Sequence, residues 1–186
     1  MQLAFYKGWN DKIGDVLLDA GIRFRQWCEP DMHGGARYSH VELVFDDAAI
    51  PTNASVDPGD PIGLASVCFS ATIREKGVRF KFINLHDDKW DLLPIPHSAV
   101  PTLPAQQRMA KYATSLCGRP YNVPGILHYV IPFVEPKHGE DYCSQVVSLV
   151  LERGGALTGP RPAFVSPAGL YVLVQREWWT GNGTAT

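Results

Sequence analysis

The chain has 186 residues, which is the size of one domain, and 45% of them are hydrophobic, which excludes intrinsic disorder for most of its length. Lys and Arg number 17 against 19 Asp and Glu, giving a formal net charge of −2. This balance argues against a nucleic-acid-binding protein and against a polybasic membrane-surface protein, because both depend on an excess of basic residues.

No segment predicts export or membrane insertion. The first residues, Met1–Gly8, lack the basic stretch and the apolar run of a secretory signal. No stretch reaches the roughly 18 apolar residues of a membrane span. The cysteines are far apart and form no CxxC pair, which argues against a disulfide framework: Cys28, Cys68, Cys117 and Cys143. We therefore expect a cytoplasmic protein.

Alternation of polar and apolar residues predicts four strands in the first half of the chain. They are Gln2–Tyr6, His40–Asp46, Leu64–Thr72 and Gly77–Leu85. The last three are close in sequence, which favours an antiparallel meander. A helix is predicted between Asn10 and Trp27, and the proline-rich segment Ile50–Gly63 is predicted to be a loop or an irregular hairpin arm.

Helical periodicity marks the second half. It predicts helices at Pro104–Cys117 and Cys143–Arg153, and Ser166 followed by Pro167 is typical of a further helix start. Between them, Asp91–Pro104 is expected to be extended and Pro120–Pro136 to be a short broken helix and loop. The sequence thus predicts one α+β domain over residues 1–179 and a disordered tail at 180–186.

Cys143 is the cysteine placed for chemistry. Asp141 is a plausible N-cap, which would put Cys143 in the first turn of its helix. Unpaired backbone N–H groups and the positive end of the helix dipole favour a thiolate there, and the same groups could stabilise an oxyanion. The alternative is a small buried apolar side chain, which is the usual state of a free cysteine.

His40 opens a predicted strand, a position from which a rigidly held imidazole could face a helix N-terminus and act as a general base. A structural or surface histidine is the alternative. A zinc site formed by Cys28, His33 and His40 fits no usual spacing of metal ligands, so no metal is predicted.

Five short motifs occur in an order that resembles the permuted papain-like cysteine amidases and peptidases, the YiiX/YaeF branch of the NlpC-like superfamily, and especially their small bacteriophage relatives. They are Ser39–Phe45, Cys68–Ala71 with Glu75–Arg79, Gly118–Tyr121, Tyr142–Val147 and Ser166–Tyr171. The resemblance covers Met1 to Tyr171. It implies a circularly permuted papain-like fold with an antiparallel sheet packed against the cysteine-bearing helix.

The resemblance also implies roles for single residues. Cys143 corresponds to the nucleophile and His40 to the base. The third polar residue, often a glutamate in that family, is matched here by Ser70, which could orient the imidazole without supplying a charge. Glu42, two residues after His40 on the same strand face, is a second candidate for that role, with a solvated strand charge as its alternative. Tyr121 is expected to line the substrate cleft or to be a core tyrosine.

The expected activity is hydrolysis of an amide bond through an acyl-thioester on Cys143, with no metal or organic cofactor. The resemblance implies a peptide or amide substrate, with peptidoglycan stem peptides as the common case, and a phage-encoded protein in the host cytoplasm or the virion. Two alternatives are a non-catalytic papain-like binding protein that acts on a host factor, and a lipid acyltransferase or thioesterase.

Overall fold

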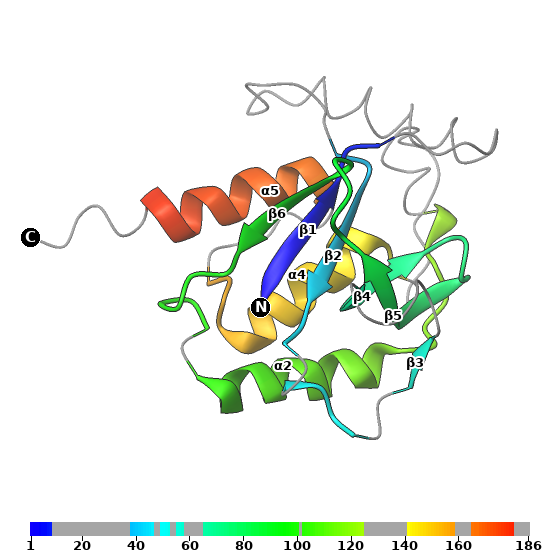
Figure 1. Cartoon of the computed structure of the whole chain (residues 1–186), viewed down its shortest axis with the longest axis horizontal. Coiled ribbons are helices and arrows are strands. Elements are labelled where there is room, and N and C mark those ends of the chain that lie inside the picture. Colours follow the sequence, from blue (N-terminus) through cyan, green and yellow to red (C-terminus); the bar gives the residue numbers. More distant parts are fainter. Residues whose placement is uncertain are drawn as a thin grey trace, which may run out of the picture.

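The strands of the described residues form one six-stranded sheet (Figure 1). The structure is a computed structural model that describes residues 1–8, 38–46, 49–52, 55–57, 65–100, 102–124, 141–158 and 165–180. Its strands are β1 (Gln2–Tyr6), β2 (His40–Val44), β3 (Val56–Asp57), β4 (Ala65–Thr72), β5 (Gly77–Asn84) and β6 (Trp90–Pro94). They lie in the order β3-β5-β4-β2-β1-β6, and all neighbours are antiparallel except β3 and β5.

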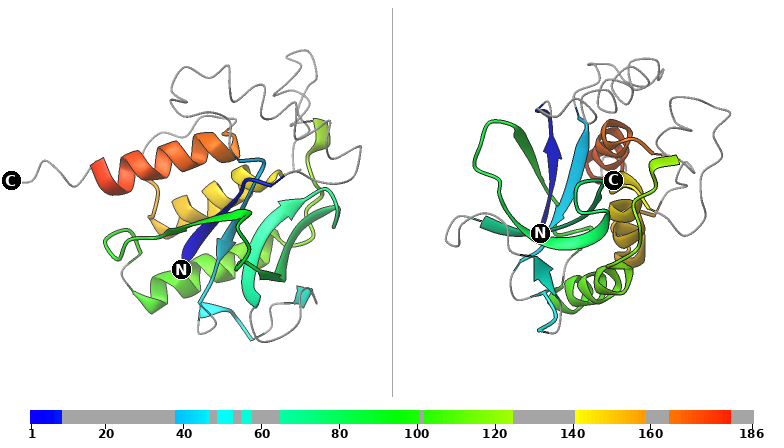
Figure 2. Two further views of the ribbon diagram at one scale, coloured as in Figure 1. Left: turned by 45° about the horizontal axis from the view of Figure 1, so that its top comes forward. Right: turned by 90° about the vertical axis from the view of Figure 1, so that its right-hand side faces the viewer.

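Helices cover one side of this sheet. They are α2 (Leu103–Leu116), α4 (Cys143–Gly154) and α5 (Pro167–Gln175), which continues into the π-helical turn η2 (Arg176–Thr180). Figure 2 shows the three α-helices gathered on one side of a curved sheet. Helix α4 packs on β2 and β4, and α2 packs beside α4. The architecture is therefore a mixed α+β one, with the cysteine-bearing helix against an antiparallel sheet.

The core lies between the sheet and the helices. Alternate strand residues such as Phe5, Leu43 and Phe69 are buried there, and α4 contributes Val147 and Leu151. Each such side chain contributes about 1.5–3 kcal/mol by leaving water. This pattern fixes which face of each strand meets the helices, so that the residues between them lie on the opposite face.

The ends of the helices follow from local chemistry. Thr102 and Ser166 cap α2 and α5, because their hydroxyl oxygens accept from the backbone N–H groups of Ala105 and Gly169. Gly155 ends α4 in the left-handed conformation, with φ of 77°. At its other end, α4 has Tyr142 as its N-cap, and Tyr142 makes no side-chain capping bond.

Most of the predicted elements are confirmed. Strand β1 has the predicted bounds, β2, β4 and β5 match the predicted meander, and the three helices start or end within a residue or two of expectation wherever the prediction gave an end. The helix predicted between Asn10 and Trp27, Leu64, most of the broken helix predicted at Pro120–Pro136, and residues 181–186 of the tail lie outside the described residues.

Two strands were not predicted. Strand β6 lies at the start of the segment expected to be merely extended, and it pairs with β1. Strand β3 lies within Ile50–Gly63, the segment predicted to be a loop or an irregular hairpin arm, and it pairs with β5 in the parallel direction. Both are edge strands, whose short sequences carry little alternation, so their pairing depends on partners distant in the chain.

None of the helices in the described ranges is both long and apolar enough to span a bilayer.

Candidate functional site

Cys143 is the first residue of α4, as expected, but the cap was assigned wrongly. The N-cap is Tyr142, and Asp141 instead accepts a hydrogen bond from Arg119 Nη1 at 3.3 Å. The backbone of Asp141 also pairs with that of Tyr121 in a short parallel bridge. The start of α4 is thereby tied to the segment that follows α2, which fixes the position of Cys143.

His40 is the first residue of β2, and the thiol of Cys143 lies close enough to its imidazole to raise the pKa of that ring. Because α4 packs directly on β2, two residues distant in sequence become neighbours at the starts of their elements. Their assignment as nucleophile and base stays a prediction.

Glu42 occupies the other side of the His40 ring. His40 Nε2 and Glu42 Oε1 are 2.8 Å apart, a hydrogen bond between residues i and i+2 on one face of β2. The side chain of Glu42 is only 1% exposed. The third polar group beside the imidazole is therefore a buried carboxylate.

Ser70 does not have the role expected for it. Its hydroxyl is buried and donates to the backbone carbonyl of Val41 at 2.7 Å, not to His40. The register of β2 with β4, continued from Val44 and Cys68, places Ser70 opposite Glu42, two residue pairs away from His40. At that position a short serine side chain satisfies its hydroxyl on the adjacent strand.

Arg79 holds Glu42 from β5. Its Nη1 donates to Glu42 Oε2 at 2.8 Å and its Nη2 donates to Glu42 Oε1 at 2.7 Å, a bidentate pair between largely buried groups. Arg79 Nε donates in turn to Glu75 Oε2 at 3.1 Å, and the other oxygen of Glu75 pairs with Lys81. The site thus continues from Cys143 into a row of alternating charges that reaches the surface.

The electrostatics of the site follow from these contacts. Burial lowers the pKa of His40, but the charge and hydrogen bond of Cys143, followed by the hydrogen bond and charge of Glu42, outweigh burial and raise it. Burial raises the pKa of Glu42, but the charge and hydrogen bonds of Arg79, with a smaller contribution from His40, lower it to about 2. The arrangement favours a protonated imidazole beside a charged carboxylate.

Access to the sulfur is narrower than expected. The imidazole of His40 keeps 22% of its surface exposed, whereas Cys143 keeps only 4%. Cys143 is packed into the main core with the start of α4, so the prediction of a cleft open to solvent at both residues is wrong for Cys143. A reagent or substrate would approach from the side of His40.

Tyr121 lies near the site through its backbone. It is half-buried against the core, and its N–H donates to the carbonyl of Lys76 at 3.2 Å. The bridge to Asp141 places it beside the segment that enters α4. This position is compatible with both roles expected for Tyr121, cleft wall and core tyrosine.

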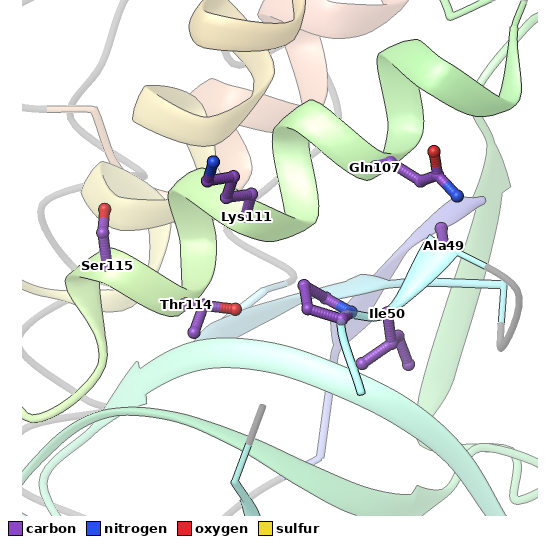
Figure 3. Close-up of a pocket in the computed structure, with 7 residues that line it drawn as sticks. Ala49, Ile50, Gln107, Lys111, Thr114 and Ser115 are labelled. Atoms are coloured by element: carbon purple, nitrogen blue, oxygen red, sulfur yellow. The ribbon is translucent and has the colours of Figure 1, made fainter. Parts of the chain in front are cut away.

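A cavity of about 490 Å³ lies elsewhere, between α2 and the chain after β2. Its lining includes Gln107, Lys111 and Thr114 from α2 and Ala49 and Ile50 from the chain after β2 (Figure 3). None of its lining residues belongs to the Cys143 site.

Within the described ranges, no group of three or more His, Cys, Asp or Glu residues could hold a metal ion. Cys28 and His33, two of the three residues considered for a zinc site, lie outside those ranges.

Arg79 was missed by the sequence analysis, and Glu42 was ranked behind Ser70. The signal for Glu42 was present, since residues i and i+2 of a strand share a face. The signal for Arg79 was weaker, because its place opposite Ser70 depends on the register of β4 with β5.

Compared with known family profiles, curated proteins and solved structures, the chain has no significant match.

Proposed function

We propose that the protein is a cysteine hydrolase that cleaves an amide bond through an acyl-thioester on Cys143. The observation that carries this proposal is the closeness of the Cys143 thiol to an imidazole whose Nε2 is held by a buried carboxylate. A nucleophile, a base in contact with it and a group that orients the base are the parts that acyl transfer by a thiol requires. The orienting group is Glu42.

The proton transfers follow from the hydrogen bonds. Glu42 engages Nε2 of His40, which leaves Nδ1 as the ring nitrogen for the sulfur. An imidazolium there stabilises a thiolate, which attacks the carbonyl carbon. The C–N bond of the tetrahedral intermediate then breaks, and His40 donates its proton to the leaving amine. In the second half, His40 takes a proton from water as the water attacks the thioester, and the acid product and the thiol are released.

The start of α4 supplies the oxyanion stabilisation. The first backbone N–H groups of a helix have no partner within the helix and carry its positive partial charge. Because Cys143 is the first residue of α4, a carbonyl bonded to its sulfur would carry its developing negative charge next to these groups.

The substrate class rests on the resemblance alone. The order of motifs around His40, Cys143 and Tyr121 resembles that of permuted papain-like amidases and peptidases, which favours a peptide or isopeptide-like amide and includes peptidoglycan stem peptides. The same resemblance favours a phage-encoded protein that acts in the host cytoplasm or in the virion.

The second candidate is a papain-like binding protein with an idle site. It is favoured by one observation, the 4% exposure of Cys143. In that case the contacts among Cys143, His40 and Glu42 would serve as a buried polar cluster, and the thiol would be inert.

Selective alkylation distinguishes the two candidates. Iodoacetamide at pH 6, followed by peptide mapping, reports each thiol separately, and the exposed Cys117 is an internal reference in the same molecule. If the site is active, Cys143 reacts faster than Cys117 despite its burial, because its thiolate is stabilised. His40→Ala then slows Cys143 at least about tenfold and leaves Cys117 unchanged, and Cys143→Ala abolishes hydrolysis of a generic peptide or ester substrate. A Cys143 that reacts more slowly than Cys117 and ignores His40→Ala favours the binding protein.

A further inference from the structure

We propose that Arg79 is a positioning residue of the site, which keeps Glu42 charged and oriented so that it always accepts from His40. This inference rests on the proposed function, since it gives Arg79 a part in preparing the Cys143 nucleophile. It deepens the proposal by extending the site to a third strand, β5.

The geometry of the pair is that of an orienting contact. Both terminal nitrogens of Arg79 donate to Glu42, at 2.8 and 2.7 Å, so the planar guanidinium fixes the plane of the carboxylate. One of the two oxygens, Oε1, also engages Nε2 of His40 at 2.8 Å. Turning Glu42 away from His40 would break the contacts with Arg79 as well.

Ser70 explains how Arg79 can reach Glu42. In the sheet, β4 lies between β2 and β5, and Arg79 pairs directly with Ser70. The two outer strands are about 10 Å apart, a span that the long side chain of Arg79 and the shorter one of Glu42 bridge together. They can meet because Ser70 is small and its hydroxyl is satisfied by Val41.

The charge of Glu42 needs this cation. A carboxylate that is 1% exposed would be driven toward its neutral form by burial, and Arg79 is the strongest influence in the opposite direction. A neutral Glu42 would no longer support the positive charge on His40. Among the described residues, three charged or titratable groups surround the Glu42–Arg79 pair: His40 on β2, Glu75 in the turn before β5 and Lys81 on β5. Cys143 on α4 acts on the pair through His40.

Arg79 is itself held in place. Its Nε donates to Glu75, which also pairs with Lys81, so the guanidinium is fixed by carboxylates on two sides. The charge of Glu42 raises the pKa of Arg79 further. Arg79 therefore stays charged at every pH at which the protein is folded.

The test is the pH dependence of Cys143 alkylation by iodoacetamide between pH 4 and 9. In the wild type, Glu42 stays ionised over this range, so it adds no step to the acid limb of the profile. In Arg79→Met, Glu42 takes up a proton within the range, and the acid limb moves to higher pH by about one unit, which is about a tenfold loss of rate on the limb. Arg79→Lys keeps the positive charge but loses the two-pronged contact of the guanidinium with Glu42, so its profile should lie between those of the wild type and Arg79→Met.

The double variant Glu42→Gln/Arg79→Met is the matched control. The glutamine at position 42 is neutral at every pH, so this variant should be slower than the wild type over the whole range, and its acid limb should lack the extra step that the titration of Glu42 adds in Arg79→Met. A purely structural role for Arg79 would not produce a pH step that depends on Glu42. If Arg79→Met fails to fold, Arg79→Lys compared with the double variant carries the same test.

The proposal is overturned if the Arg79→Met profile superimposes on that of the wild type, or if the extra step of Arg79→Met persists in the double variant, in which no carboxylate remains at position 42. A wild type in which Cys143 reacts no faster than Cys117 contradicts the proposed hydrolase itself. A reactive wild type with an unchanged Arg79→Met profile contradicts only the role of Arg79.

Discussion

His40 lies between two groups that both favour its protonated form. On one side is the thiol of Cys143 and on the other the carboxylate of Glu42, and together they raise the pKa of the imidazole to about 10 in spite of burial. A histidine in an unfolded chain titrates near 6.5. Folding therefore binds a proton at this residue near neutral pH.

The first prediction is that His40 remains an imidazolium from pH 5 to 8. Side-chain NMR of labelled histidine should show no titration of His40 in this range, whereas the chain unfolded in urea titrates near 6.5. Cys143→Ala should lower the pKa of His40 by about one unit or more, because the charge and hydrogen-bond contributions of Cys143 that raise it are lost. A His40 signal that titrates near 6.5 in the folded wild type would contradict both the charge assignment and the mechanism built on it.

The same shift has a consequence for stability, with a definite sign. A raised pKa means that the protonated form stabilises the folded state. The contribution of His40 is complete below about pH 6.5 and is lost as the pH rises through about 10. The destabilisation caused by His40→Ala should accordingly shrink between pH 6 and pH 10.

At the scale of elements, register does more than sequence motif to build the site. The pairs of β4 with β5 place Ser70 beside Arg79, and the register of β2 with β4, continued by two residues, places Ser70 opposite Glu42. Ser70 is thus a spacer in the middle strand, which permits a contact between its two neighbours. The resemblance assigned to Ser70 the contact with His40 that Glu42 makes.

The second prediction separates these two roles of Ser70. Ser70→Ala removes only the hydrogen bond to Val41, so it should cost about 1 kcal/mol and leave the alkylation rate of Cys143 within about twofold. Ser70→Leu places a branched side chain where Arg79 crosses β4, and it should slow alkylation in the manner of Arg79→Met. Urea unfolding and peptide mapping measure the two effects. An inactive but stable Ser70→Ala variant would restore Ser70 as the third member of the site.

A close backbone contact of another strand also positions α4. The first residue of β5, Gly77, lies so close to the chain after α2 that a Cβ there would be 2.2 Å from the carbonyl oxygen of Arg119. Val78 then donates its N–H to the same oxygen at 2.9 Å. The segment from Arg119 leads to Tyr121 and its bridge with Asp141, two residues before Cys143. Strand β5 thereby helps to fix the start of α4.

Local pattern accounts for the elements that were predicted and long-range pairing for those that were not. Alternation marked β1, β2, β4 and β5, and the 3.6-residue period marked α2 and α4, because each of these elements buries one face. The position of Cys143 at a helix start was visible for the same reason. Strand β6 was missed since its partner β1 is distant in sequence, and Arg79 was missed since its partner lies two strands away.

At the scale of the whole molecule, the charges buried at the site occur as a pair of opposite sign. Glu42 and Arg79 are both largely buried, and each compensates the other. Removing two charges from water is costly, and the net contribution of such a pair to stability is often small or negative. Removal of one partner is different, because it leaves an uncompensated charge in the interior.

The third prediction is a double-mutant cycle on this pair. Arg79→Met alone should destabilise the fold by about 3–5 kcal/mol, whereas Glu42→Gln/Arg79→Met should be close to the wild type. Because the pKa of Glu42 is lowered to about 2, its ionised form stabilises the fold above about pH 4.5, and this contribution is lost as the pH falls toward 2. Any stability advantage of the wild type over the double variant should therefore narrow in acid. Urea unfolding at pH 3 and pH 7 measures both effects, and additivity of the two single variants would contradict the pairing.

The order of the site residues along the chain also sets the order in which they become available during synthesis. During synthesis, the strand with His40 and Glu42 leaves the ribosome first, Arg79 follows, and Cys143 emerges last. At roughly 5–20 residues per second, about 5–20 s pass between the synthesis of His40 and that of Cys143. The strands β2, β4 and β5 and the charge pair across them can form in that interval, before the thiol of Cys143 is present. The sheet that holds His40 can thus be complete before α4 packs against it.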